Sequence, residues 1–250
     1  MNPSEFVDIC HERLKTSQEG FDYLTKDRLL TVDLIKAENL GFCDHAIAKK
    51  FCDDGNGRWK AGPSFFANRV VIPIRDDCGH VLAWASRSIY PHEKGWWNTP
   101  FRKEFNLYGI DAARNTAFAC NKIYIVEGYM DVLSLRLSGL SNVVGLMGTG
   151  LTLGHVGLIL RYCNHVVFCF DGDPPKERED GTMEDGPGMR ALKKVVAEYG
   201  RSNHFEEMST ILLPPPDDPA EYMQKNGLES FIGLEQNIIT ARTGVECRGM

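Results

Sequence analysis

The second half of the chain alternates short apolar runs with amphipathic segments. The apolar runs occupy residues 122–126, 142–148, 165–170 and 209–214. Each is followed by a stretch in which apolar residues recur at helical spacing, over residues 129–139, 151–163, 189–199 and 218–227. Strands that alternate with crossover helices predict an α/β fold, with a mostly parallel sheet and helices on both faces.

The first half has a different pattern. Residues 1–56 are predicted to be mostly helical, and residues 65–90 to form a β-hairpin that turns at 76–79. Pro73 lies within the first strand of this hairpin, which favours an edge position or a bulge. We therefore expect three parts: a basic α+β N-terminal subdomain (1–118), a parallel-sheet subdomain (119–215) and a short helical C-terminal segment (216–250). The polar insert at 174–188 is predicted to be a passive surface loop rather than an acidic lid.

Composition narrows the class of protein. Of the 250 residues, 43% are hydrophobic and 25% are charged, which is typical of globular proteins. The chain has no apolar run long enough for a membrane span and no secretory signal pattern at its N-terminus. Its eight cysteines include no CxxC pair, so neither a structural zinc site nor a disulfide framework is expected. These features predict a cytoplasmic protein with reduced thiols.

Charge is unevenly distributed along the chain. The net charge is −6, yet residues 58–103 carry eight basic and three acidic side chains, whereas residues 171–185 carry seven acidic and two basic ones. A basic segment beside an acidic one suits a phosphate-binding surface next to a metal site. Charge on solvated loops is the equally weighted alternative.

Acidic residues end three of the predicted strands. Glu127 follows the first, Asp171 and Asp173 follow the third, and Asp217-Asp218 follows the fourth. In open parallel sheets functional groups gather at the carboxyl ends of strands, so these side chains are expected to converge. Asp131 falls on the first turn of the next helix; taken alone, it favours a capping role. Converging carboxylates either bind protons or hold a cation, and oxygen ligands select Mg²⁺ or Mn²⁺.

The segment IVEGYMDVLSL, followed by GLMGTGLTLGHVGLILR and VVFCFDGD, resembles the Toprim core of DnaG-type bacterial and phage primases. The resemblance implies that Glu127 is a catalytic acid/base or metal-organising group and that Asp171 and Asp173 bind metal. It also implies catalytic importance for Asp131, and it places Asp218 at the first metal-linked position of a later acidic segment. Two or more Mg²⁺ or Mn²⁺ ions are then expected. The family's Gly-Thr motif is present as Gly148-Thr149.

The resemblance extends upstream and covers about residues 20–228. The segments FFANRVVIPIRDDCGHVLAWASRS and FRKEFNLYGIDAA are similar to the primase N-terminal subdomain and to its link into Toprim. They point to Arg69, Arg75, Arg87 and Lys103 as residues that bind phosphates of nucleotide or template. The implied activity is synthesis of short RNA primers on single-stranded DNA from nucleoside triphosphates, in a bacterial cell or a phage host.

The sequence also departs from the family pattern. The family's zinc ribbon and helicase-interaction domain are not expected within these residues, so a replicative helicase or a separate zinc-ribbon protein is the expected partner. Ala220 stands where the family has a second Asp, which Asp217 or Glu221 could replace. The family's lysine aligns with Gly95, one position after Lys94. Two alternatives stay open: a Toprim nuclease, and a catalytically weakened nucleic-acid-binding module that needs a partner chain.

Overall fold

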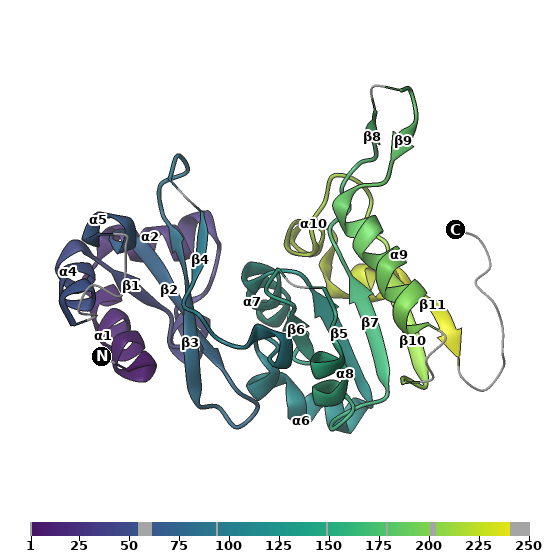
Figure 1. Ribbon diagram of the computed structural model, residues 1–250, viewed down its shortest axis with the longest axis horizontal. Helices are drawn as coiled ribbons and strands as arrows, with labels where there is room; N and C mark the ends of the chain where they lie inside the picture. The colour runs from purple at the N-terminus through teal and green to yellow at the C-terminus, as the bar shows by residue number, and fades with distance from the viewer. Residues whose placement is uncertain are drawn as a thin grey trace. The chain divides into compact units, whose positions relative to one another are not determined.

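The computed structural model describes residues 2–54, 62–93, 95–148, 150–178, 180–200 and 204–240. It divides into two compact units, Met1–Phe101 and Arg102–Met250 (Figure 1); the sequence pattern had placed the boundary after residue 118. No described helix is long and apolar enough to cross a membrane. Lys94 and Thr149 lie outside the described part of the chain. So do Arg58, Lys60 and Glu179 of the two charged segments, and Cys247 among the cysteines.

The first unit is a four-stranded antiparallel sheet with helices. Its helices are α1 (Pro3–Leu14), α2 (Gln18–Asp22), a π-helix (Tyr23–Asp27), α3 (Val32–Ala37), α4 (His45–Asp54) and α5 (Pro63–Phe66). Its strands are β1 (Gly41–Cys43), β2 (Arg69–Arg75), β3 (Val81–Ser88) and β4 (Trp96–Asn98), in the order β1-β2-β3-β4. Phe6 of α1 stacks on Trp84 of β3 with ring centroids 4.2 Å apart, so α1 covers one face of the sheet.

The predicted hairpin is confirmed, but β2 is not an edge strand. It pairs with β3 from Arg69 to Arg75 and with β1 from Arg69 to Val71. Pro73 is tolerated because it lies beyond the end of β1, where its missing N–H has no partner to lose. The register between β2 and β3 shifts between Ile74 and Arg75, just after Pro73. The irregularity that the bulge alternative predicted therefore lies next to the proline.

The second unit is built on a five-stranded sheet with the order β11-β10-β7-β5-β6. Its strands are β5 (Lys122–Val126), β6 (Val143–Gly145), β7 (His165–Cys169), β10 (Glu207–Ile211) and β11 (Glu235–Thr240). Its helices are η2 (Lys103–Phe105), α6 (Ile110–Cys120), α7 (Tyr129–Leu137), α8 (Leu153–Ile159), α9 (Pro187–Tyr199) and α10 (Pro219–Gly233). The first four strands in chain order are parallel, as predicted.

Helices cover both faces of this sheet, which also confirms the prediction. Side chains of α6, α8 and α9 share a core with alternate residues of β5 and β7 (Figure 1). On the opposite face α10 packs against α7. Because both faces are covered, the strands are apolar at successive positions, which explains their continuous apolar runs.

The expectation of a purely helical C-terminal segment is wrong. After α10 the chain forms β11, which pairs antiparallel with β10 at the edge of the sheet. Its sequence, EQNIIT, is half polar and gives no clear strand signal. Glu235 anchors it: Lys122 Nζ donates to both carboxylate oxygens at 2.9 and 3.0 Å, and the Tyr124 hydroxyl donates at 3.3 Å.

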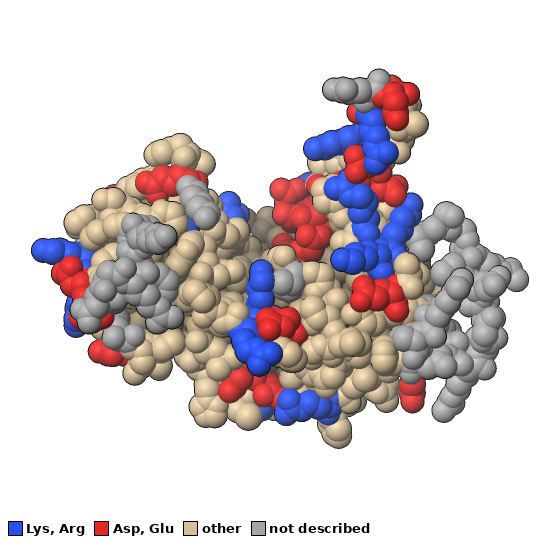
Figure 2. All heavy atoms as spheres, in the orientation of Figure 1, with Lys and Arg blue, Asp and Glu red and all other residues tan. Residues whose placement is uncertain are grey.

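The insert after β7 is a short hairpin rather than an irregular loop. Strands β8 (Lys176–Glu177) and β9 (Met183–Glu184) pair antiparallel, and the hairpin projects from the N-terminal end of α9 (Figure 1). Glu184 pairs with Arg178 at 3.3 Å and with Arg190 of α9 at 2.7 Å. Positive and negative side chains therefore alternate along the hairpin and α9 (Figure 2).

Candidate active site

The predicted acidic residues of the second unit come together at the carboxyl ends of its parallel strands. Glu127 directly follows β5 and Asp171 lies two residues after β7, and these strands are neighbours in the sheet. The strand order reverses here, because β6 continues on one side of β5 and β7 on the other. Such a reversal leaves a crevice at the strand ends, where α/β proteins bind ligands. The Asp171 amide donates to the Glu127 carboxylate across this crevice.

Burial and mutual repulsion raise the pKa of the acids in this crevice. Burial first, then the negative charge of Asp131, raises the pKa of Asp171 to about 7. Burial and the charge of Asp218 raise the pKa of Asp131 to about 6. The pKa of Glu127 is raised by burial and by Asp173. Asp171 is the residue on which the charges of the other four carboxylates act together.

Two carboxylate oxygens in the crevice lack a protein partner. Asp171 Oδ1 and Glu127 Oε1 are buried, and neither has a hydrogen bond within the described part of the chain. A buried acceptor without a partner is costly, and a bound cation would relieve both that cost and the repulsion. No three of these acids place ligand oxygens within 4.8 Å of one another among the described residues. A cation would therefore be held by one or two carboxylates, which suits Mg²⁺ with water and phosphate completing its shell.

Asp131 and Asp218 each have a structural task as well. Asp131 Oδ2 accepts a hydrogen bond from the Gly128 amide at 3.0 Å and so closes the start of α7. Asp218 Oδ1 accepts from the Glu221 amide at 2.7 Å and caps α10. Both capping and a place in the acidic cluster are therefore observed for these residues, and neither role excludes the other.

The position of Ala220 is not compensated by Asp217 in this structure. The Asp217 carboxylate is paired with Lys225 of α10. The Asp217 carbonyl accepts a hydrogen bond from the Gly172 amide at 2.9 Å. Glu221, the other candidate, is exposed and lies 3.8 Å from the same lysine. Asp217 thus fixes the loop after β7 through its backbone.

Three glycines hold the aspartate loop, and the sequence reasoning missed two of them. A Cβ at Gly186 would lie 2.2 Å from the Asp173 carbonyl oxygen, and one at Gly188 would lie 2.2 Å from that of Asp171. A Cβ on Gly172 would lie 2.8–3.1 Å from three carbonyl oxygens of the 213–217 turn. The backbone of the aspartates is therefore clamped between the start of α9 and this turn. The available signal was the Gly-Pro-Gly that ends the insert and begins a helix.

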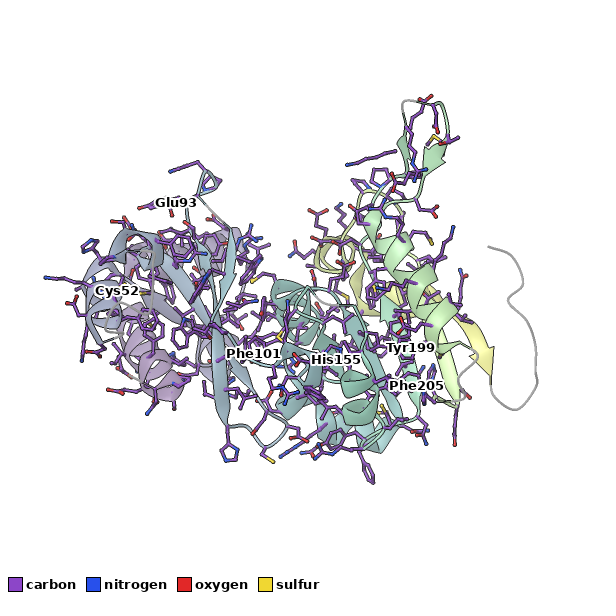
Figure 3. The ribbon with its side chains drawn as sticks, viewed as in Figure 1. Cys52, Glu93, Phe101, His155, Tyr199 and Phe205 are labelled. Atoms are coloured by element: carbon purple, nitrogen blue, oxygen red, sulfur yellow. The ribbon has the colours of Figure 1, made fainter. Side chains whose placement is uncertain are left out.

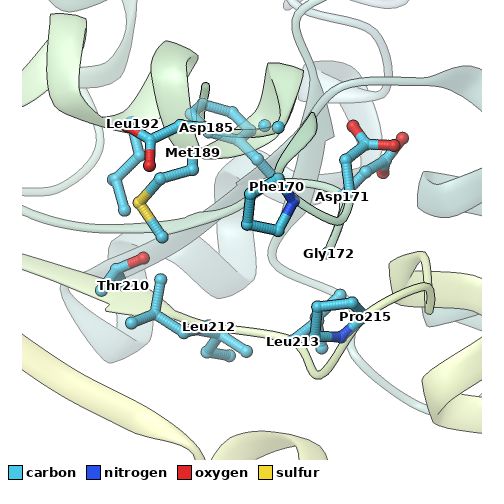
Figure 4. Close-up of a pocket in the computed structure, with 15 residues that line it drawn as sticks. Phe170, Asp171, Gly172, Asp185, Met189, Leu192, Thr210, Leu212, Leu213 and Pro215 are labelled. Atoms are coloured by element: carbon cyan, nitrogen blue, oxygen red, sulfur yellow. The ribbon is translucent and has the colours of Figure 1, made fainter. Parts of the chain in front are cut away.

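A cavity of about 240 Å³ adjoins the same loop (Figure 4). Asp171 and Asp173 line it, and so does Asp185 of the insert, which lies apart from Asp171 in Figure 4. Its remaining wall is mainly apolar, from Phe170, Met189, Leu192, Leu212 and Leu213. The hairpin insert therefore contributes directly to the surroundings of the aspartates.

The predicted phosphate-binding residues are divided between the two units. Arg69 is 1% exposed; its guanidinium donates to Ser86 Oγ at 3.0 Å, to the Ser86 carbonyl at 3.1 Å and to the Gly95 carbonyl. Arg75 donates to the Glu38 carbonyl at 3.2 Å, and the Arg87 guanidinium lies over the Trp96 ring, 5.4 Å from its centroid. These three arginines belong to the first unit, whereas Lys103 begins η2 in the second.

His155 belongs to the buried interior of the second unit. It is fully buried (Figure 3), its Nε2 lies 2.8 Å from the Lys103 carbonyl oxygen, and its Nδ1 lies 3.3 Å from the Thr152 amide. Burial lowers its pKa, which favours the neutral ring. Cys163 and Cys169 are also buried.

The chain is similar to known DNA primases. Residues 9–114 match the family model of the DNA primase catalytic core, N-terminal domain, and residues 121–204 match the Toprim domain. A DNA primase of Legionella pneumophila is 28% identical over 252 residues, which cover 93% of this chain and 42% of that protein. The chain belongs to the DnaG-type primase family.

Solved primases share the fold. The zinc-binding and RNA polymerase domains of the Aquifex aeolicus primase superpose with a TM-score of 0.73 and 25% identity, over 95% of this chain and 62% of that one. A DnaG catalytic domain bound to single-stranded DNA superposes with a TM-score of 0.70 and 24% identity, over 92% and 80%. The chain spans less than half the length of the Legionella DnaG-type relative.

The primase models cover most of the candidate residues. The N-terminal model includes Arg69, Arg75, Arg87 and Lys103, and the Toprim model includes Glu127, Asp131, Asp171 and Asp173. Asp218 lies beyond both, at the cap of α10. A Toprim domain implies divalent metal ions, and the crowded oxygens described above fit such ions.

Proposed function

We propose that this chain synthesises short RNA primers on a single-stranded DNA template by nucleotidyl transfer. The observation that carries the proposal is the crevice at the ends of β5 and β7, where four carboxylates repel Asp171. Two buried oxygens there, Asp171 Oδ1 and Glu127 Oε1, have no hydrogen-bond partner among the described residues. In a primase catalytic core such oxygens can bind the divalent cations that accompany nucleoside triphosphates.

We assign the metal-holding residues to Glu127, Asp171, Asp173 and Asp218, with Mg²⁺ or Mn²⁺ as the ion. When bound, two or more such ions neutralise the phosphates of the incoming nucleotide. In the reaction the 3′-hydroxyl oxygen of one nucleotide bonds to the α-phosphorus of the other, and pyrophosphate leaves. Glu127 has a raised pKa and so is suited to accept the hydroxyl proton or to orient its neighbours.

The basic side chains are proposed to bind phosphates of template and nucleotide. Arg75, Arg87 and Lys103 are only partly buried and can reach such groups. Arg69 would have to leave its three acceptors to do so. We therefore propose that Arg69 acts indirectly, by tying β2 to β3 and to the start of β4, where Trp96 meets Arg87.

Template choice is proposed to involve further parts. The Aquifex relative has a zinc-binding domain beside its RNA polymerase domain. We propose that a zinc-binding module, in the same or in a separate chain, and a replicative helicase assist this core. The DNA-bound relative supports single-stranded DNA as the template.

The test is primer synthesis on single-stranded DNA of mixed sequence with labelled nucleoside triphosphates and Mg²⁺ or Mn²⁺. Asp171→Asn should lose at least about a hundredfold of the activity, because an amide cannot replace the charge that holds a cation. Glu177→Gln on β8 is the control, since its side chain is an exposed acid outside the crevice. Equal activity of wild type and Asp171→Asn contradicts the assignment. Cleavage of labelled nucleic acid without nucleotides, lost in the same variant, would identify a nuclease.

A further inference from the structure

A second cavity shares Phe170 with the first, and Glu127 is part of its wall. It measures about 290 Å³. Gly148 and Gly150, which follow β6, line it together with Ala191, Lys194 and Val195 of α9. No residue of this cavity was singled out by the sequence except Glu127 and Gly148.

Lys194 is the one basic side chain that lines this cavity among the described residues. It is exposed, and within the described ranges no carboxylate pairs with it. Glu198, one turn further along α9, is the obvious partner, but its carboxylate is hydrogen-bonded to the Tyr199 hydroxyl. An ammonium group without a partner at the mouth of a cavity is suited to bind an anion.

The two glycines that line this cavity allow a close approach of a ligand to the backbone. Gly148 has φ +77°, and a Cβ on Gly148 or Gly150 would meet nothing within 4 Å. These glycines are therefore not required by packing, in contrast to Gly186 and Gly188. Exposed glycine backbone and a lysine in the wall of one cavity are groups that accommodate phosphate oxygens.

We propose that Lys194, Gly148 and Gly150 line a polyphosphate subsite beside Glu127. The inference rests on the proposed function for its substrate class, nucleoside triphosphates. The polyphosphate has two possible sources with the same chemistry: the 5′-triphosphate of the initiating nucleotide, which does not react, or the pyrophosphate that leaves. Both must lie near the acidic crevice, and neither needs to pair with the template.

The first arm of the test measures binding without synthesis. The full chain is dialysed to equilibrium against labelled inorganic tripolyphosphate at saturating Mg²⁺. Lys194→Ala should weaken binding about tenfold, and Lys194→Arg should bind within about threefold of wild type. Lys193→Ala is the matched control, because the neighbouring lysine pairs with Asp185 at 2.7 Å and does not line the cavity. Equal binding by wild type, Lys194→Ala and Lys193→Ala overturns the proposal.

The second arm identifies the source. Primer synthesis is started either with a nucleoside triphosphate or with a dinucleotide that has a 5′-hydroxyl. A Lys194→Ala defect confined to the triphosphate start assigns the subsite to the initiating nucleotide. A defect in both, with slowed pyrophosphorolysis, assigns it to pyrophosphate. If the wild-type protein binds tripolyphosphate through Lys194 but makes no primers, the subsite is supported and the proposed function is refuted. If Lys194→Ala makes primers at the full wild-type rate, the proposed function is supported and the subsite is refuted.

Discussion

Arg69 in the first unit and Asp171 in the second are both ionisable groups withdrawn from solvent, but their surroundings are opposite. The Arg69 guanidinium donates to three oxygen acceptors of its own unit and lies over the Phe65 ring. Asp171 Oδ1 has no hydrogen-bond partner in the described part of the chain, and four other carboxylates repel it. The fold gives the first group hydrogen-bond partners and leaves an oxygen of the second without one among the described residues.

This difference separates charges that support the fold from charges that await a ligand. Hydrogen bonds offset much of the cost of burying a charge, and removal of the charged group then leaves its partners unsatisfied. A buried charge among like charges destabilises the fold, and such an arrangement is found at sites where a bound ligand offsets the repulsion. We therefore expect substitution of Arg69 to change stability and substitution around Asp171 to change activity.

The largest effect is expected from Gly188→Ala. Its new Cβ would lie 2.2 Å from the Asp171 carbonyl oxygen, so the aspartate loop must move. Primer synthesis should fall by about a hundredfold, because a small displacement of positioned groups is costly in catalysis. The matched control is Gly157→Ala in α8, where a Cβ meets nothing within 4 Å. Wild-type rates in Gly188→Ala would show that the clamp on Asp171 is dispensable.

The next effect is on stability. Arg69→Met removes the guanidinium that donates to Ser86 Oγ and to the Ser86 and Gly95 carbonyls, so the free energy of unfolding should fall by about 2–3 kcal/mol. Arg87→Met, the control, removes only a contact with Trp96 and should change that free energy by less than about 0.5 kcal/mol. Urea unfolding followed by circular dichroism measures both. Unchanged stability with lost DNA binding in Arg69→Met would reverse our assignment of this residue.

Metal affinity should depend on pH. The pKa of Asp171 is raised to about 7, so below that pH a cation must displace a proton from this carboxyl. The Mg²⁺ dissociation constant should therefore rise by about tenfold for each pH unit below 7 and level off above it. Titration of Mg²⁺ binding between pH 5.5 and 8.5 tests this. An affinity that is flat across that range would mean that Asp171 does not hold the ion.

The smallest effect concerns the metal-free protein. Because the folded-state pKa of Asp171 lies above the unfolded value, stability falls as pH rises from about 4 to about 7 and stays low above it. Asp171→Asn removes this cost, so at pH 8 without metal it should melt about 2–4 °C higher than wild type. The difference should vanish near pH 4. A variant that melts lower at pH 8 would show that the carboxylate is satisfied after all.

The acids at the strand ends were predictable, because the apolar patterns of strands and of helices are enough to locate them. Alternating apolar runs and amphipathic segments indicated parallel strands with crossover helices, and residues such as Glu127 and Asp171 directly follow the runs. Carboxyl ends of parallel strands share one edge of a sheet, so convergence followed from topology alone. The hairpin of β2 and β3 was equally visible from its turn.

Other features depended on contacts between residues far apart in the chain. β11 has a half-polar sequence, and its place in the sheet depends on pairing with β10 and on Glu235 meeting Lys122. In the sequence Arg69 cannot be distinguished from the other strand arginines. In the structure its guanidinium donates to the Ser86 and Gly95 carbonyls. No local pattern encodes either contact.

The amino-acid sequence by itself therefore determined which chemical groups stand at the ends of the strands, because backbone periodicity is a local property. The tertiary structure alone decided which of the charges are satisfied. It turned the insert into a hairpin tied to α9, brought Gly186 and Gly188 against the aspartate backbone, and placed Lys194 and Glu127 in the wall of one cavity. Hydrogen bonds and electrostatic repulsion act through space, so their sum is known only once the chain is folded.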